Sequence, residues 1–163
     1  LVIVTKIDGK ISAASPDILA KAIRNSVDIY GADIINVSLG LQKDNKALSS
    51  AIAYAEKKGV LVVAAAGNDG KDGKPYYPAH YKTVFAVGSC DKNGNESDFS
   101  QTGADVLAPG EDILLASRNG QRSGARGTSF ASGFVAAAAA NYRRTLPQQQ
   151  PSCVITLKIS NTI

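Results

Sequence analysis

The sequence of 163 residues contains no methionine, and it begins at Leu1 inside the apolar, β-branched run Leu1–Val4. A ribosomal product starts with methionine, and a bulky second residue such as leucine normally prevents its removal. We therefore expect that residue 1 is not the start of the gene product. The run is also too short for a signal peptide and lacks the basic flank of one. It predicts a strand over residues 1–5.

Long apolar runs and strong charge are also missing. No stretch reaches the roughly 18 apolar residues of a membrane-spanning helix. The net charge is only +4, and no cluster of lysine and arginine alternates with aromatic residues. The sequence therefore indicates neither a membrane nor a nucleic acid as a partner. An apolar fraction of 44% over 163 residues predicts one globular domain spanning residues 1–163.

Cysteine and histidine are scarce. Cys90 and Cys153 allow a single disulfide, but nothing in the sequence brings them together, so we expect two ordinary thiols. Neither cysteine stands in a motif for metal binding or redox chemistry. The sequence therefore indicates neither a cysteine nucleophile nor a metal centre built on cysteine.

The apolar residues that are present alternate between short continuous runs and runs at helical spacing. This order is typical of an α/β fold with a mostly parallel sheet and helices on both faces. Strands are predicted at 1–5, 34–39, 60–66, 84–89, 106–108 and 113–116, and helices between 15 and 31, after 44–45 up to 57–59, and from about 129 to 143. Residues 68–78 and 91–103 are predicted loops because they are rich in Gly, Asp, Asn and Lys.

One stretch stands out, in which Gly127-Thr128-Ser129 precedes a long run of small and apolar residues. This pattern predicts a tight turn into a helix with Ser129 in its first turn. Free N–H groups and the helix dipole stabilise negative charge at such a place, as an attacked carbonyl requires. The alternative is an ordinary Ser/Thr cap on a buried, alanine-rich helix.

Two upstream segments end predicted strands, and active groups of parallel α/β sheets collect at the carboxyl ends of strands. Asn68 follows the strand that ends in Ala64-Ala65-Ala66-Gly67, where its amide is able to donate to an oxyanion above Ser129. The alternative is that Gly67-Asn68 simply turns the chain. Ser38-Leu39-Gly40 ends another strand, whose backbone can pair with an extended peptide or can be a plain strand end.

Together these segments resemble the subtilisin-like serine peptidases, the subtilase family, over almost the whole chain. Ile35-Asn36-Val37-Ser38-Leu39-Gly40 resembles the substrate-binding strand, and Ala64-Ala65-Ala66-Gly67-Asn68 resembles the oxyanion-hole strand. Gly127-Thr128-Ser129-Phe130-Ala131-Ser132 resembles the nucleophile motif. The resemblance implies the C-terminal part of a subtilisin-like domain and an endopeptidase that forms an acyl-enzyme on Ser129. It also implies peptide or protein substrates and a secreted, extracellular protein.

The same resemblance assigns roles to individual residues. It makes Ser129 the nucleophile, Asn68 the oxyanion donor and Thr128 a neighbour that supports the oxyanion hole. It also implies peptide-binding walls formed by Ser38, Leu39, Gly40, Ala65, Ala66 and Gly67. These walls contain no acidic residue, which predicts apolar or aromatic residues before the cut bond.

The sequence departs from the family in several places. Gly133 and Phe134 stand where members normally carry proline and often histidine. The family's acidic and histidine motifs lie before the point where this sequence begins, and neither Asp8 nor His80 has their context. We therefore expect the catalytic Asp and His to come from an upstream part of the same domain. The alternative is a pseudoenzyme or peptide-binding module.

The end of the chain has two interpretations. Propensity favours a strand after Pro151, whereas the resemblance implies a final helix over 151–160, and we adopt the helix. The resemblance requires no cofactor and no metal. It allows a structural calcium ion at 69–72 or 91–98, although solvated loops are the simpler interpretation.

Overall fold

The computed structural model describes residues 2–5, 15–116, 122–145 and 153–157, and all structural statements refer to them. Its centre is a six-stranded sheet in the order β1-β8-β2-β3-β4-β5, in which every neighbouring pair is parallel. The strands are β1 (Val2–Thr5), β2 (Ile34–Val37), β3 (Leu61–Ala65), β4 (Phe85–Cys90), β5 (Val106–Pro109) and β8 (Val154–Leu157).

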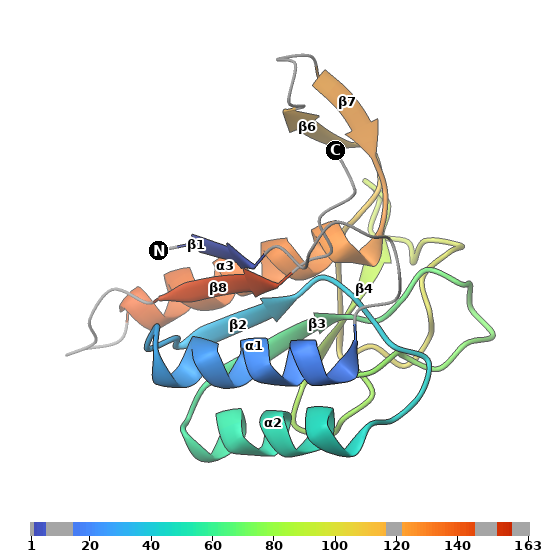
Figure 1. The fold of residues 1–163 in the computed structure, drawn as a ribbon. Coiled ribbons are helices and arrows are strands. Elements are labelled where there is room, and N and C mark those ends of the chain that lie inside the picture. The colour runs from blue at the N-terminus through green and yellow to red at the C-terminus, as the bar shows by residue number, and fades with distance from the viewer. Residues whose placement is uncertain (1, 6–14, 117–121, 146–152, 158–163) are drawn as a thin grey trace.

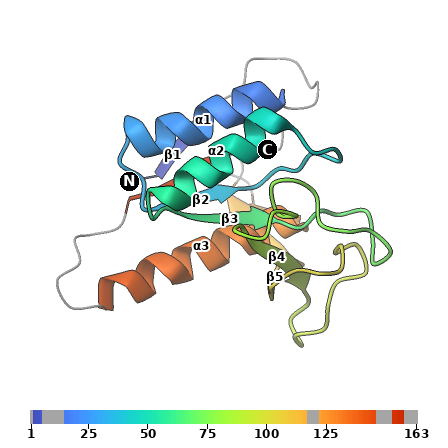
Figure 2. The same cartoon turned by 90° about the horizontal axis from the view of Figure 1, so that it is seen from below.

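Three helices cover the two faces of this sheet. Helices α1 (Pro16–Asp28) and α2 (Lys46–Lys57) pack side by side on one face, and α3 (Thr128–Thr145) crosses the other (Figures 1 and 2). The prediction of an α/β fold with a mostly parallel sheet and helices on both faces is confirmed.

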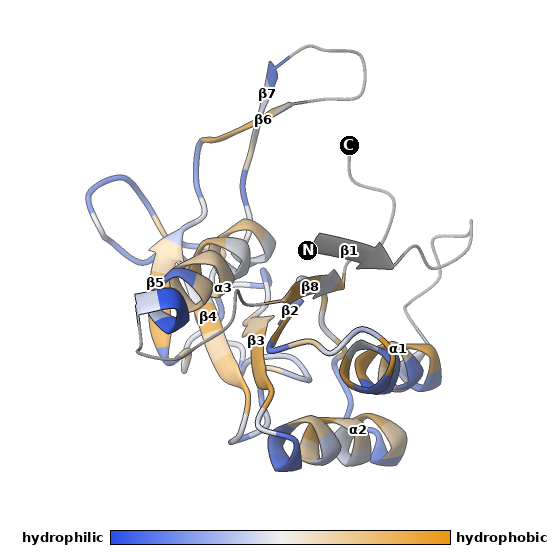
Figure 3. Ribbon diagram, turned by 90° about the vertical axis from the view of Figure 1, so that its left-hand side faces the viewer, coloured by the Kyte–Doolittle hydropathy of each residue, from blue (hydrophilic) through white to orange (hydrophobic). Residues whose placement is uncertain are grey.

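The strand side chains alternate between two cores because successive residues of a strand point to opposite faces. Ile35 and Val37 of β2 are buried against α1 and α2, whose apolar faces turn toward the sheet (Figure 3). Ile34 is buried on the other face with Ala131 and Ala136 of α3. The small side chains of α3 allow its backbone to lie close to the sheet.

Local signals fix some of the helix ends. The Asn45 side chain accepts hydrogen bonds from the N–H groups of Ala47 (2.8 Å) and Leu48 (3.1 Å), so it caps α2 as the sequence predicts. Gly59, with φ +74°, follows the end of the same helix. Ser15 precedes α1 but makes no capping hydrogen bond with its side chain.

The helix predicted over 151–160 is wrong for residues 154–157, which form the strand β8. This strand pairs with β1 on one side and with β2 on the other. Ile155 and Leu157, only 0% and 2% exposed, contribute to the core beneath α1. The strand propensity of the β-branched residues is therefore the correct guide here, and the helix implied by the family resemblance is not. The rest of 151–160, apart from Cys153, lies outside the described residues.

A separate antiparallel hairpin stands above the sheet (Figure 1). It consists of β6 (Ile113–Ala116), which was predicted, and β7 (Arg122–Ala125), which was not. Leu114 on β6 is 62% exposed, so the hairpin presents an apolar side chain outside the main core.

Both cysteines are free thiols, as predicted. Burial, with smaller contributions from Asp91 and Glu111, raises the pKa of the Cys90 thiol, so this group stays protonated to higher pH. Among the described helices, none is both long and apolar enough to cross a membrane. The described residues also contain no cluster of three or more His, Cys, Asp or Glu side chains suited to a metal.

The loop at 91–98 is held together by its own hydrogen bonds. The Asp91 carboxylate accepts from the Asn95 side chain (3.1 Å) and from the backbone N–H groups of Asn93 (2.8 Å) and Asn95 (2.9 Å). These hydrogen bonds lower the pKa of Asp91, and the bond from the Asn95 side chain has the largest effect. The carboxylate therefore stabilises the turn directly.

The strand assignment for β8 predicts an alternating response to mutation. Ile155→Ala should destabilise the chain by about 2–5 kcal/mol because it empties a fully buried site. Thr156→Ala, at the next and partly exposed position, should cost well under half of that. Urea unfolding of the two variants measures the difference, and equal losses would contradict the alternation.

Candidate active site

Ser129 lies in the first turn of α3, as the sequence predicts. Gly127 precedes the helix with φ +150°, a conformation that glycine adopts without strain. A Cβ atom at this position would lie 3.4 Å from Asn68 Nδ2. This separation is an ordinary van der Waals contact, so the glycine is explained by its positive φ rather than by the approach of Asn68. No described acceptor pairs with the backbone N–H of Ser129.

Asn68 is fixed against this helix by its carbonyl oxygen. Its Oδ1 accepts hydrogen bonds from the Thr128 N–H and from the Thr128 hydroxyl, both at 2.9 Å. The same hydroxyl accepts from the Gly67 N–H at 3.2 Å. Because Oδ1 is occupied by two donors, the orientation of the amide is defined and Nδ2 is its outward donor. Within the described residues, Nδ2 makes no hydrogen bond.

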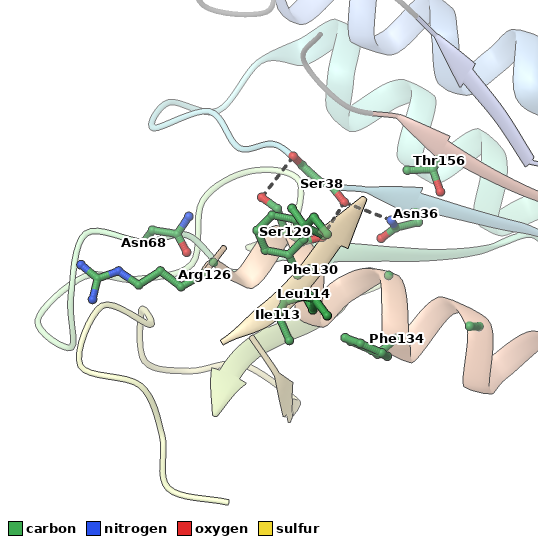
Figure 4. A pocket seen from close by; sticks show the side chains of 14 residues that line it. Asn36, Ser38, Asn68, Ile113, Leu114, Arg126, Ser129, Phe130, Phe134 and Thr156 are labelled. Atoms are coloured by element: carbon green, nitrogen blue, oxygen red, sulfur yellow. Dashed lines mark hydrogen bonds between the residues drawn. The ribbon is translucent and has the colours of Figure 1, made fainter. Parts of the chain in front are cut away.

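A second set of hydroxyl groups joins β2 to α3. Ser38 Oγ donates to the Ser129 carbonyl at 2.9 Å, and Ser132 Oγ approaches the same carbonyl at 3.1 Å. Asn36 Nδ2 donates to Ser38 Oγ at 3.0 Å, and its Oδ1 is buried without a partner among the described residues (Figure 4). The network fixes the backbone of Ser129 relative to the end of β2.

The hydroxyl oxygen of Ser129 is loosely held. Ser129 Oγ lies 3.4 Å from the Ser38 carbonyl oxygen, which is a long hydrogen bond. No described histidine or carboxylate contacts it. His80 is exposed and packs edge-on against Tyr77, with ring centroids 5.1 Å apart, as the sequence predicts for a surface residue. Asp8 lies outside the described residues.

A pocket of 740 Å³ opens beside Ser129 (Figure 4). Its polar end holds Ser38, Asn68 and Ser129. Ser38 follows β2, Asn68 follows β3 and Ser129 belongs to α3, so these side chains meet beyond the carboxyl ends of the two strands. Its apolar part is formed by the hairpin and α3. Residues not predicted from sequence also line it, namely Asn36, Ile113, Leu114, Leu115, Arg126, Phe130, Gly133, Phe134, Ala137 and Thr156.

The two predicted peptide-binding walls differ in their backbone. No backbone hydrogen bond of Leu39 or Gly40 exists among the described residues, so this segment has donors and acceptors available. The backbone groups of Ala66 and Gly67 already make hydrogen bonds. The Ala66 N–H donates to Val87 and the Ala66 carbonyl accepts from Tyr76. The Gly67 N–H donates to Thr128 and the Gly67 carbonyl accepts from Gln101. Ala65, Ala66 and Leu39 are buried. Residues 65–67 are therefore able to contact a peptide through their surface, whereas residues 39–40 are able to form backbone hydrogen bonds with it.

The arrangement of these residues agrees with a comparison of the sequence with known protein families. The sequence profile of the subtilase family, Peptidase S8, matches residues 2–162. The chain belongs to the subtilase family. Subtilisin DY of Bacillus licheniformis is 44% identical over 115 residues, which are 68% of this chain and 42% of that protein. Thermitase of Thermoactinomyces vulgaris is 44% identical over 123 residues, 74% of this chain and 43% of that protein.

Solved structures of subtilases show the same fold. The prenylagaramide maturation protease PagA superposes with a TM-score of 0.78 at 35% identity, covering 90% of this chain and 56% of that one. The patellamide maturation protease PatA superposes with a TM-score of 0.76 at 37% identity, covering 85% of this chain and 54% of that one. The chain thus spans less than half the length of these two curated subtilases and a little over half of these solved structures.

The tie between Asn68 and α3 can be tested by removing one hydroxyl. Thr128→Val keeps the shape of a fully buried side chain but leaves the Gly67 N–H without an acceptor and removes one of the two donors to Asn68. We expect a loss of about 1–3 kcal/mol of unfolding free energy. Thr145→Val is the matched control because that hydroxyl is exposed. Urea unfolding measures both, and similar small losses would contradict the structural role.

Proposed function

We propose that this chain provides the nucleophile and oxyanion hole of a serine endopeptidase that cleaves peptide bonds through an acyl-enzyme on Ser129. The observation that carries the proposal is the fixed Asn68 amide. Its Oδ1 is held by Thr128. Among the described residues, its Nδ2 and the N–H of Ser129 are therefore the two donors left beside the Ser129 hydroxyl. Membership of the subtilase family supports the same roles.

In the proposed reaction, Ser129 Oγ attacks the carbonyl carbon of the substrate and the carbonyl oxygen becomes an anion. The Ser129 N–H and Asn68 Nδ2 donate to this oxygen, and the positive end of the α3 dipole favours its charge. The serine proton passes to a base and then to the departing amine, which leaves Ser129 as an ester. Water, deprotonated by the same base, hydrolyses the ester and restores the hydroxyl.

The base for these steps is proposed to come from residues outside 1–163. By family resemblance it is a histidine oriented by an aspartate, both in an upstream part of the same domain. The pocket beside Ser129 supports this proposal because it contains the buried Oδ1 of Asn36, which has no hydrogen-bond partner among the described residues. A buried acceptor without a donor is costly, and an added segment is able to supply one.

The substrate is proposed to be an extended peptide or protein segment. The backbone groups of Leu39 and Gly40, which make no hydrogen bond within the described part of the chain, are able to pair with it as an added strand, while Ala65–Gly67 contact its other side. The proposed chemistry requires no cofactor or metal, although calcium at 69–72 or 91–98 remains a prediction from the family. A secreted location is proposed on the same resemblance.

A pseudoenzyme or peptide-binding module is the competing function. It is favoured by one observation, namely that no described histidine contacts Ser129. The two functions differ in the sequence upstream of Leu1. Aspartate and histidine motifs of the subtilase type there support the peptidase, whereas their loss in an otherwise intact domain supports the binding module.

The oxyanion hole gives the first test of this function. In the complete peptidase, Asn68→Leu should lower kcat by about 10²–10³ with little change in KM, because the lost hydrogen bond forms only in the transition state. The magnitude is the one known for an oxyanion-hole donor of subtilisin and is adopted rather than derived. An unchanged kcat in steady-state peptide hydrolysis would remove Asn68 from the mechanism.

The missing base gives the second test. Residues 1–163 alone should not hydrolyse peptides at an enzymatic rate, because a serine hydroxyl without a neighbouring histidine is barely ionised at neutral pH. The assay uses a peptide library and a serine-directed fluorophosphonate, before and after addition of the upstream segment, with Ser129→Ala as control. Robust turnover by residues 1–163 alone, abolished in the control, would refute the proposed base and redirect attention to His80.

A further inference from the structure

The side chain of Tyr76 lies between the ends of β2 and β3. A Cβ atom placed on Gly40 would meet Tyr76 Cβ at 2.6 Å and Cδ2 at 3.0 Å. A Cβ atom on Gly67 would meet the same Cδ2 at 3.2 Å. One aromatic ring therefore contacts both segments that we propose as walls of the peptide site. The absence of side chains at the two glycines is what allows the ring to lie there.

Hydrogen bonds hold this ring in place from both sides. The Tyr76 hydroxyl bonds to Asp69, which follows the Gly67 segment, and accepts from Gln42 Nε2 at 3.1 Å, which follows the Gly40 segment. The Tyr76 N–H donates to the Ala66 carbonyl at 2.8 Å. Because three bonds and two close contacts orient the residue, a ligand cannot displace the ring without losing them.

Gln101 closes the space next to the ring. This side chain is 2% exposed, and its Nε2 donates to the Lys74 carbonyl at 2.6 Å. Its Oε1 lies where a Cβ atom of Gly67 would be, with a separation of only 1.4 Å. The pocket beside Ser129 is lined by neither Gly40 nor Gly67. Tyr76 and Gln101 therefore lie against the two glycines of the walls. A separate pocket of 700 Å³ opens on the far side of the ring, lined by Gly40, Asp69 and Tyr76 among others.

We infer that Tyr76 limits the size of the substrate side chain that precedes the cut bond, so that small residues such as Gly, Ala and Ser are accepted. This inference rests on the proposed function. A peptide paired with Leu39 and Gly40, with its reacting carbonyl at Ser129, directs that side chain into the gap between the walls. The ring occupies this gap. A preference for small side chains thereby replaces the preference for apolar or aromatic residues that the sequence predicts before the cut bond.

The test uses the full chain, meaning residues 1–163 with the proposed upstream segment, and peptides that differ only in the residue before the cut bond. The unmodified enzyme should cleave after Ala at least about tenfold more efficiently, in kcat/KM, than after Phe. Tyr76→Ala should shift this ratio toward Phe by about tenfold or more, since it opens the gap. Tyr76→Phe keeps the ring but loses the hydroxyl bonds to Asp69 and Gln42, so its ratio should lie between those of the unmodified enzyme and Tyr76→Ala.

Tyr142→Ala is the matched control, because Tyr142 is 69% exposed on α3 and its loss should not change the ratio. Efficient cleavage after Phe by the unmodified enzyme would overturn the inference, even if Tyr76→Ala fails to fold. An active enzyme whose ratio does not respond to Tyr76→Ala would overturn it as well. An unmodified enzyme that cleaves no peptide and does not react with a fluorophosphonate would instead refute the proposed function, and this inference with it.

Discussion

The site depends on the hydrogen bonds by which Thr128 joins the end of β3 to the start of α3. The Thr128 hydroxyl accepts from the Gly67 N–H and donates to Asn68, whose oxygen also receives the Thr128 N–H. Each of these groups would cost about 1–3 kcal/mol if it were buried without a partner. The bonds therefore set the position of Asn68 relative to Ser129, although the two residues lie on different elements and 61 positions apart.

The sheet determines where this contact forms. Strands β2 and β3 are parallel neighbours, so their carboxyl ends lie at the same edge and bring Ser38 and Asn68 to the N-terminus of α3. The alanine-rich face of α3 lets the helix lie close to Ile34, Val63 and Val87, which a larger side chain would prevent. Ser38 then anchors the Ser129 carbonyl, so packing and hydrogen bonding position the same residue.

Features governed by short-range chemistry could be predicted from sequence. The Asn45 cap, the glycine before Ser129 and the strand ends at Ser38 and Asn68 depend on a few adjacent residues. Three-dimensional pairing governs the features that were missed. Strand β7 contains Arg, Ser and Gly and forms only because β6 lies opposite it. Strand β8 was wrongly predicted to be a helix because the strands with which it pairs are distant in sequence. Asn36, a polar residue inside the apolar run 34–39, was a signal that could have been used.

The proposed mechanism divides serine peptidase chemistry into two contributions. In this mechanism the Ser129 N–H and the Asn68 side chain stabilise the developing oxyanion, and hydrogen bonds of Thr128 and Ser38 hold these two residues in place. Proton transfer requires a base that must lie within hydrogen-bond reach of Ser129 Oγ. The long 3.4 Å contact of this oxygen with the Ser38 carbonyl is weak, so exchanging it for an imidazole costs little. The electrostatic part is thus fixed in advance, whereas the nucleophile itself remains free to accept a partner.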